Sequence, residues 1–174
     1  SLSLPAPGAA GSLGANSDVV IDTTPPLITE LRLFNANGDP LHVDTARFTF
    51  SEPVAFDTAG FTVRDEGGAA FVFDAAIAPV DVLGDGTVWE AQFQDNIGLT
   101  GADFTFSYDS AVGTVVDVAN NALANLNDVP ATDVADLAII SAYTEDLLPT
   151  QPDGLVDTYV ITFTERVDDD SILA

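Results

Sequence analysis

Short stretches in which apolar and polar residues alternate recur along the chain. The clearest are FTF at residues 48–50, FTV at 61–63 and FTFSY at 104–108. A strand that buries one face and wets the other needs this period of two, so the pattern predicts an all-β protein. Further strands are expected at residues 27–34, 70–80, 87–94 and 113–118.

Clusters of turn-forming residues separate these stretches. Residues 35–40, 65–68 and 84–86 contain Asn-Gly or Asp-Gly steps or paired glycines, which permit the positive φ of tight hairpins. About seven short strands separated by such turns predict an immunoglobulin-like β-sandwich. Only residues 120–127 suggest a helical turn. Six rings on the expected strands should face the core: Phe48, Phe50, Phe61, Phe93, Phe104 and Phe106.

The chain also repeats itself. DTARFTFSEPV at residues 44–54 and DTYVITFTERV at 157–167 match at six positions with an offset of 113. A second echo joins AGSLGANSDV at residues 10–19 to NNALANLNDV at 120–129, with an offset of 110. Two echoes in the same order at nearly the same period predict tandem repeats.

These echoes divide the chain into three parts. Residues 1–21 are expected to be the tail of a preceding Ig-like repeat and its linker, residues 22–131 a complete Ig-like β-sandwich repeat, and residues 132–174 the truncated start of the next. The DTTPP run at residues 22–26 predicts a stiff linker, because two prolines fix φ and remove two backbone donors. Residues 128–136 hold only Pro130 and should form a more pliant junction.

The charge balance of the chain changes the functional picture. Twenty-eight acidic residues face four arginines and no lysine, for a net charge of −24. Nucleic acids and anionic membrane surfaces would repel such a chain, since contacts with phosphate need Lys and Arg. No apolar run approaches the roughly 20 residues that span a bilayer, so no membrane insertion is expected in this segment. The absence of cysteine excludes disulfides and thiolate chemistry.

An acidic chain attracts cations, and the excess of Asp over Glu favours calcium, which prefers oxygen donors in loops. One candidate group is Asp153 and Asp157, which flank a turn glycine; Asp81 and Asp85 form a looser analogue. A second group would meet at one pole of the sandwich and hold calcium between repeats. It consists of Asp18, Asp22, Glu52 and Asp117. The alternative interpretations are solvated residues that cap turns and general adaptation to salt.

Catalytic patterns are missing from the sequence. His42 is the single histidine, no G-x-S-x-G motif surrounds a serine, and a chain without lysine has no phosphate-binding P-loop. We therefore expect no enzyme activity. Trp89 leaves a carbohydrate partner open, because an exposed indole stacks on sugars. The alternative is that Trp89, Ala91 and Phe93 share one strand face and fill the core.

Three phrases point to a known family. DTTPPLI at residues 22–28, FSEPV at 50–54 and VDVANNAL at 116–123 resemble the bacterial Ig-like domain found in surface-layer proteins and large repetitive adhesins. Asn120 stands where that family usually has Gly, and Arg166 replaces the proline of FSEPV in the following repeat. Asn still tolerates the left-handed conformation.

The resemblance implies an extracellular or cell-surface structural repeat of a surface layer, filament or adhesin stalk. Its partners would be neighbouring repeats and other copies of the same chain, and calcium would stiffen the array. The rival interpretation is an accessory carbohydrate- or ligand-binding module of a secreted multidomain protein. A third is an appendage to a secreted hydrolase.

Overall fold

The computed structural model describes residues 9, 12, 21–38, 41–99, 103–135, 137–146, 156, 158–164 and 167, with the backbone alone at 95–99. These residues form strands, turns and extended segments, and none of them lies in a helix. The predicted all-β class is confirmed. In the part of the chain so described, no helix is long and apolar enough to span a membrane.

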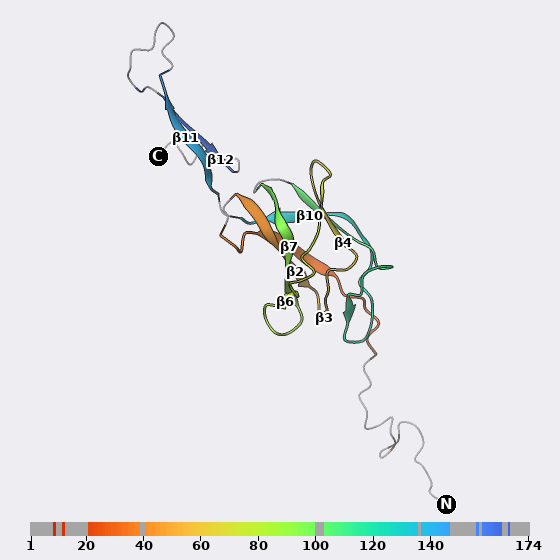
Figure 1. The fold of residues 1–174 in the computed structure, drawn as a ribbon. Coiled ribbons are helices and arrows are strands. Elements are labelled where there is room, and N and C mark those ends of the chain that lie inside the picture. Colours follow the sequence, from red (N-terminus) through yellow and green to blue (C-terminus); the bar gives the residue numbers. More distant parts are fainter. Residues whose placement is uncertain are drawn as a thin grey trace, which may run out of the picture.

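Twelve strands follow one another along the described residues. They are β1 (Ile28–Phe34), β2 (His42–Phe50), β3 (Val54–Ala55), β4 (Phe61–Asp65), β5 (Ala70–Phe71), β6 (Val80–Asp81), β7 (Val88–Leu99), β8 (Phe104–Tyr108), β9 (Val116–Asp117), β10 (Leu126–Asp133), β11 (Ile139–Glu145) and β12 (Thr158–Phe163). Eight of them make one sheet in the order β5-β4-β8-β10-β1-β2-β7-β6, while β3 pairs with β9 and β11 with β12 (Figure 1).

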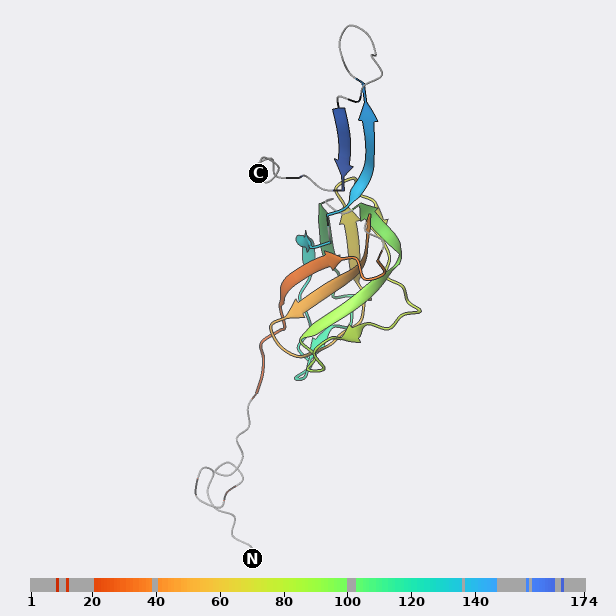
Figure 2. The same ribbon diagram turned by 90° about the vertical axis from the view of Figure 1, so that its left-hand side faces the viewer.

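The eight-stranded sheet curls so that its two halves face each other (Figure 2). The ring of Phe48 on β2 lies 5.0 Å from that of Phe61 on β4 and 5.6 Å from that of Phe106 on β8. These strands belong to opposite halves of the sheet, so the aromatic side chains fill the space between them. The parallel pair β1–β10 joins the two halves, and the other strand pairs described are antiparallel.

The rings that the alternation placed inward belong to the core. Phe61 is partly buried against the core, and the other five predicted rings are buried. Alternation therefore identified the inner face correctly, because successive side chains of a strand point to opposite sides.

Several expected elements differ from the structure. Of the strand expected at residues 113–118, only Val116–Asp117 forms one, β9. Residues 70–80 form two short strands instead of one, because Asp74 turns the chain: its Oδ1 accepts a hydrogen bond from Ala76 N at 2.8 Å. Residues 120–127 form no helical turn. Asn120 has φ +68°, the left-handed conformation expected of the residue in the family's glycine position, and ends the turn that follows β9.

The junction expected at residues 128–136 is mostly strand. β10 runs to Asp133 and pairs with β8 and with β1, where Thr132 lies opposite Arg32. Pro130 lies opposite Thr105 of β8, outside the short stretch of β10 that pairs with β1. A proline is tolerated there because only one side of the strand carries a ladder. The expectation of a pliant linker was wrong for residues 128–133, which belong to β10.

The hairpin β11–β12 lies outside the eight-stranded sheet (Figure 1). Its register begins with Ile139 opposite Phe163 and shifts before Ser141, which lies opposite Thr162. The hairpin β1–β2 has the same pattern: Ile28 lies opposite Phe50, and the shift precedes Glu30, which lies opposite Thr49. Both hairpins therefore have the same register and an irregularity at the same place.

The two hairpins also close with the same pair of hydrogen bonds. Leu27 N donates to Ser51 Oγ at 3.0 Å, and Ser51 N donates to Leu27 O at 2.9 Å. In the second hairpin, Ala138 N donates to Thr164 Oγ1 at 3.0 Å, and Thr164 N donates to Ala138 O at 2.9 Å. The Ser or Thr that follows each second strand thus ties it to the residue before the first.

We expect Phe48→Ala to lower the free energy of unfolding by about 3–5 kcal/mol, because it empties the centre of the aromatic core. Phe48 is fully buried and contacts four other rings. Val72→Ala is the control, since Val72 is 65% exposed and should cost less than about 0.5 kcal/mol. Urea denaturation measures both. Equal effects would contradict this assignment of the core.

Candidate metal centre

Three segments of the chain bring carboxylates together at one end of the sheet. Glu52 follows β2, Asp22 lies in the linker before β1, and Asp117 ends β9. Pairing of β3 with β9, with Val54 opposite Asp117, places the Glu52 segment beside Asp117. The hydrogen bonds between Leu27 and Ser51 bring the linker to the same place.

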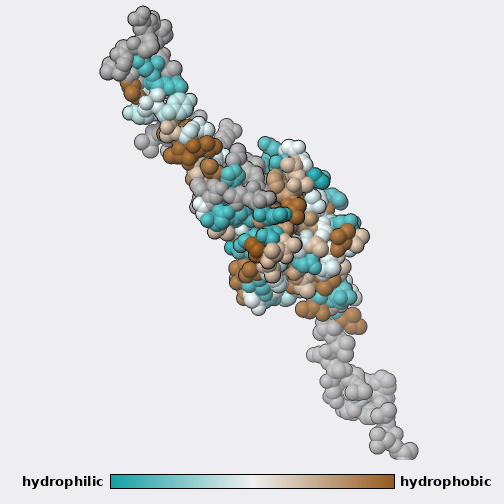
Figure 3. Space-filling view, viewed as in Figure 1, coloured by the Kyte–Doolittle hydropathy of each residue, from teal (hydrophilic) through white to brown (hydrophobic). Residues whose placement is uncertain are grey.

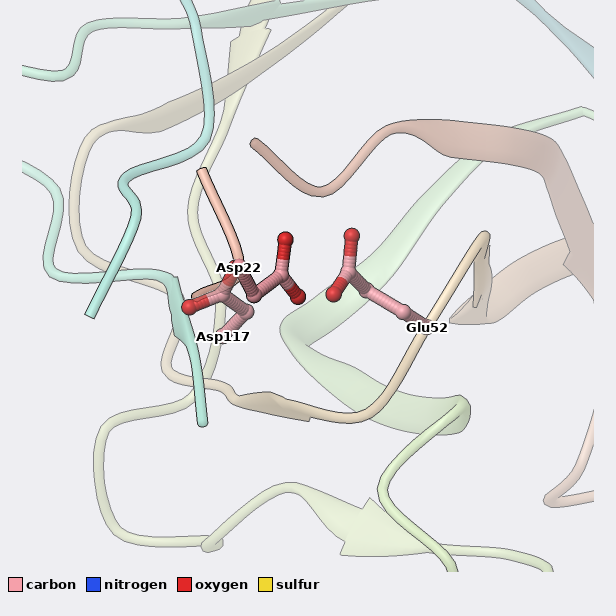
Figure 4. A group of neighbouring side chains, drawn as sticks. All are labelled: Asp22, Glu52 and Asp117. Atoms are coloured by element: carbon pink, nitrogen blue, oxygen red, sulfur yellow. The ribbon is translucent and has the colours of Figure 1, made fainter. Parts of the chain in front are cut away.

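One carboxylate oxygen each from Asp22, Glu52 and Asp117 lies within 4.8 Å of the others. Figure 4 shows the three groups pointing toward one another from their separate segments. Three of the candidate metal ligands singled out from the sequence therefore meet. Asp18, Asp153 and Asp157 lie outside the described residues.

Asp117 is the most firmly held of the three. It is 4% exposed, and its Oδ1 accepts hydrogen bonds from the backbone N–H of Ala119 and of Asn121, both at 2.8 Å. Its Oδ2 accepts from the side-chain amide of Asn121 at 2.8 Å. Short side chains such as Asp often organise turns in this way.

Asn121 also reaches the linker. Its Nδ2 lies 3.3 Å from the carbonyl oxygen of Asp22 and 3.4 Å from that of Thr24. Pro26, further along the linker, is fully buried. The linker, residues 22–26, is thus packed at this end on the body of the unit, by which we mean the eight-stranded sheet together with β3 and β9. Asn121 was not among the residues predicted for the site, although it belongs to the VDVANNAL phrase.

The pKa values of two of these carboxyl groups shift in opposite directions. Loss of hydration raises the pKa of Glu52, and the negative charges of Asp22 and Asp117 raise it further. Loss of hydration also opposes the ionisation of Asp117. However, hydrogen bonds from the Asn121 side chain and from the backbone of Asn121, Ala119 and Asn120 outweigh it and lower the pKa of Asp117. Electrostatic repulsion within the group therefore contributes to the raised pKa of Glu52, whereas the pKa of Asp117 is lowered.

The arginines that the structure describes are engaged elsewhere. Arg32 pairs with Glu30 at 2.7 Å, Arg47 pairs with Glu90, and Arg64 donates to the carbonyl oxygen of Gly68 at 3.0 Å. The carboxylate group therefore concentrates negative charge that these side chains do not balance. Oxygen donors converging from three segments are the ligand type that a hard cation such as calcium takes.

The looser group at Asp81 and Asp85 is hydrogen-bonded within its own loop. Asp81 accepts hydrogen bonds from Gly84 N at 2.9 Å and Gly86 N at 2.8 Å. Asp85 Oδ1 accepts from both Oγ1 and N of Thr87, at 2.6 and 2.9 Å, and these bonds lower the pKa of Asp85. Both residues cap their own loop. Within the described ranges, Asp22, Glu52 and Asp117 are the one carboxylate group of three this close.

Trp89 lies at the edge of the core. Its ring stacks with that of Phe56 at 5.7 Å, and its Nε1 donates to the carbonyl oxygen of Gly86 at 3.0 Å. Ala91 and Phe93, two and four residues later on the same strand, are buried. The contacts of Trp89 favour the interpretation that it completes the core rather than stacks on a sugar.

No protein-family model and no curated protein matches the sequence. Two solved structures are similar to the chain in fold. The structure of surface layer protein SbsC, domains 1-6, has a TM-score of 0.47 at 13% identity, over 70% of this chain and 15% of that one. The crystal structure of the S-layer protein rSbsC(31-844) has a TM-score of 0.45 at 14% identity, over 72% and 16%. The chain thus spans about a sixth of either protein.

We expect Glu52→Gln to stabilise the metal-free protein at neutral pH. Because the folded-state pKa of Glu52 is raised, the folded state binds this proton more tightly than the unfolded state does. The contribution of Glu52 to the unfolding free energy therefore falls as pH rises through its pKa. The neutral amide of Gln does not ionise, so the variant keeps the unfolding free energy that the parent protein loses. This difference in unfolding free energy should disappear on acidification below the ordinary pKa of Glu.

Urea denaturation in chelator, at neutral pH and near pH 4, measures this effect. Glu66→Gln is the control, since Glu66 is exposed in the turn after β4. A loss of stability in Glu52→Gln at neutral pH would contradict the repulsion inferred here.

We expect Asp117→Asn to have the opposite effect and to lower the free energy of unfolding at neutral pH. The lowered pKa of Asp117 means that its ionised form stabilises the fold above the ordinary pKa of Asp, and this is lost as pH falls.

Proposed function

We propose that the chain is part of an extracellular structural array built from Ig-like β-sandwich units in tandem, whose junctions are stiffened by calcium. Such an array would serve a surface layer, a filament or an adhesin stalk, and would assemble with neighbouring repeats and other copies of the chain. The resemblance of the DTTPPLI, FSEPV and VDVANNAL phrases to bacterial Ig-like domains supports this setting. We propose no catalytic role.

The observation that carries the tandem arrangement is the hairpin β11–β12. It shares with β1–β2 the register, the irregularity and the closing hydrogen bonds described above. The approach to each hairpin is also alike: Asp22 Oδ1 accepts from Thr24 N, and Asp133 Oδ1 accepts from Ala135 N, both at 2.9 Å. These matches favour a second unit that begins as the first one does.

The carboxylate group supports calcium because of where its members lie. Asp22 belongs to the linker, whereas Glu52 and Asp117 belong to the body of the unit. A cation held by all three would tie the linker to the body at the point where a preceding unit would attach. A ligand that binds only the folded arrangement stabilises it by mass action.

We expect calcium to raise the midpoint of thermal unfolding of the 174-residue chain by a few degrees at about 10 mM, as suits an extracellular site with a Kd of roughly 10⁻⁴ to 10⁻³ M. The shift is measured against chelator at matched ionic strength. Glu52→Gln and Asp117→Asn should abolish it, and Glu66→Gln should retain it. Small-angle scattering of a longer chain with two complete units should show greater length in calcium.

Equal midpoints and equal lengths in calcium and chelator would remove calcium from the proposal and leave the acidic residues as surface solvation. Stabilisation by sodium chloride alone, indifferent to Glu52→Gln, would assign the acidity to adaptation to salt.

A further inference from the structure

The hairpin β11–β12 exposes apolar side chains on both of its faces. The exposed fractions range from 46% for Ile140 to 77% for Tyr159, and Ile139, Tyr143 and Ile161 lie between them. Hydrophobic residues gather over the base of this hairpin in Figure 3. An isolated two-stranded hairpin is marginally stable in water, and an apolar surface of this kind marks an interface.

The register shows which face is the inner one. The pair Ala142 and Ile161 occupies the place that Leu31 and Phe48 hold in the first hairpin. Both Leu31 and Phe48 are buried in the core. Tyr159 lies on the same side as Ile161, because it is two residues away on the strand.

The opposite face corresponds to the outside of the first unit. The pair Tyr143 and Val160 occupies the place of Arg32 and Arg47. Arg47 lies at the surface, where its Nε donates to Glu90 on β7 at 2.8 Å. Exposure in the present structure does not separate these two faces of the hairpin, whereas the correspondence with β1–β2 does.

The first hairpin also shows what covers the inner face. β10 pairs with the free edge of β1 in parallel, and β7 pairs with the free edge of β2 in antiparallel, with Trp89 opposite Phe48. Across the core, rings from β4 and β8 contact Phe48. Whatever covers the second hairpin must therefore supply a strand parallel to β11, a strand antiparallel to β12, and an apolar layer across the inner face.

We infer that the face of β11–β12 formed by Ala142, Tyr159, Ile161 and Phe163 is the inner face of a second unit, covered by later strands of the same polypeptide that correspond to β4, β7, β8 and β10. This inference rests on the tandem arrangement proposed above and adds to it the face and the strands involved. The register of the hairpin, and not the extent of the chain, supports it.

The test supplies the hairpin with the strands that the first unit already uses. In a longer chain, Thr164 is followed by residues 52–133 of this sequence, since Thr164 corresponds to Ser51. We expect two complete units, seen as an approximate doubling of the calorimetric heat of unfolding relative to the 174-residue chain. The backbone amides of β11 and β12 should become protected from hydrogen exchange.

Two neighbouring substitutions test the assignment of the faces. Ile161→Arg places a charge on the inner face and should abolish the second unit, with loss of the added heat and of the amide protection. Val160→Arg introduces the same side chain one residue away, at the position of Arg47, and should leave both readouts unchanged. Arginine at residue 160 would also face the copy of Glu90 in the added strands.

Equal effects of the two substitutions would overturn the inference. If the parent hairpin forms no second unit, a variant with Ala142→Leu and Thr144→Leu restores the bulk of Leu31 and Leu33. Folding of that variant supports the assignment, and its failure overturns it. Dimerisation of the 174-residue chain that Ile161→Arg dissolves would assign the face to a second copy instead. The calcium response is measured on the first unit, so it stands or falls independently.

Discussion

The parallel pairing of β1 with β10 is the contact that joins the two halves of the curled sheet. Leu33 lies opposite Asp133, and the ladder extends to a hydrogen bond from Val134 N to Leu33 O at 2.9 Å. Because the strand that opens the unit and the strand that closes it run in the same direction, the chain enters at one end and leaves at the other. A fold with antiparallel first and last strands would return the chain to its starting end. Parallel pairing thus suits units that follow one another in a line.

The same topology explains why the carboxylates gather at the entry end. β1 starts there, β2 ends there because it is antiparallel to β1, and β9 pairs with the segment that follows β2. Asp22, Glu52 and Asp117 therefore meet as a consequence of strand order. Their repulsion is local, since Asp117 is satisfied by N–H donors and Glu52 carries the raised pKa.

Sequence alone predicted the features that depend on local pattern. Alternation identified Phe48 and Phe106 as core residues, and the family phrase marked Asn120 as the position with positive φ. It missed β10, because Pro130 and the polar residues around it indicate a linker unless the ladders on each side of the strand are known. It also missed Asn121, whose role depends on the linker lying 3.3 Å away. Both errors concern contacts between segments distant in the sequence.

In the proposed array, the stability of each unit and the stiffness of a junction would depend on separate interactions. The aromatic core around Phe48 lies between the sheet halves and involves none of the three clustered carboxylates. At the entry end, Asn121 and the buried Pro26 already hold the linker without a cation. The cation would add a bond between Asp22 and the body, at a place where the hydrogen bonds to the linker are long, 3.3 and 3.4 Å. In the proposed array, loss of calcium should therefore let the angle between neighbouring units vary well before it unfolds either of them.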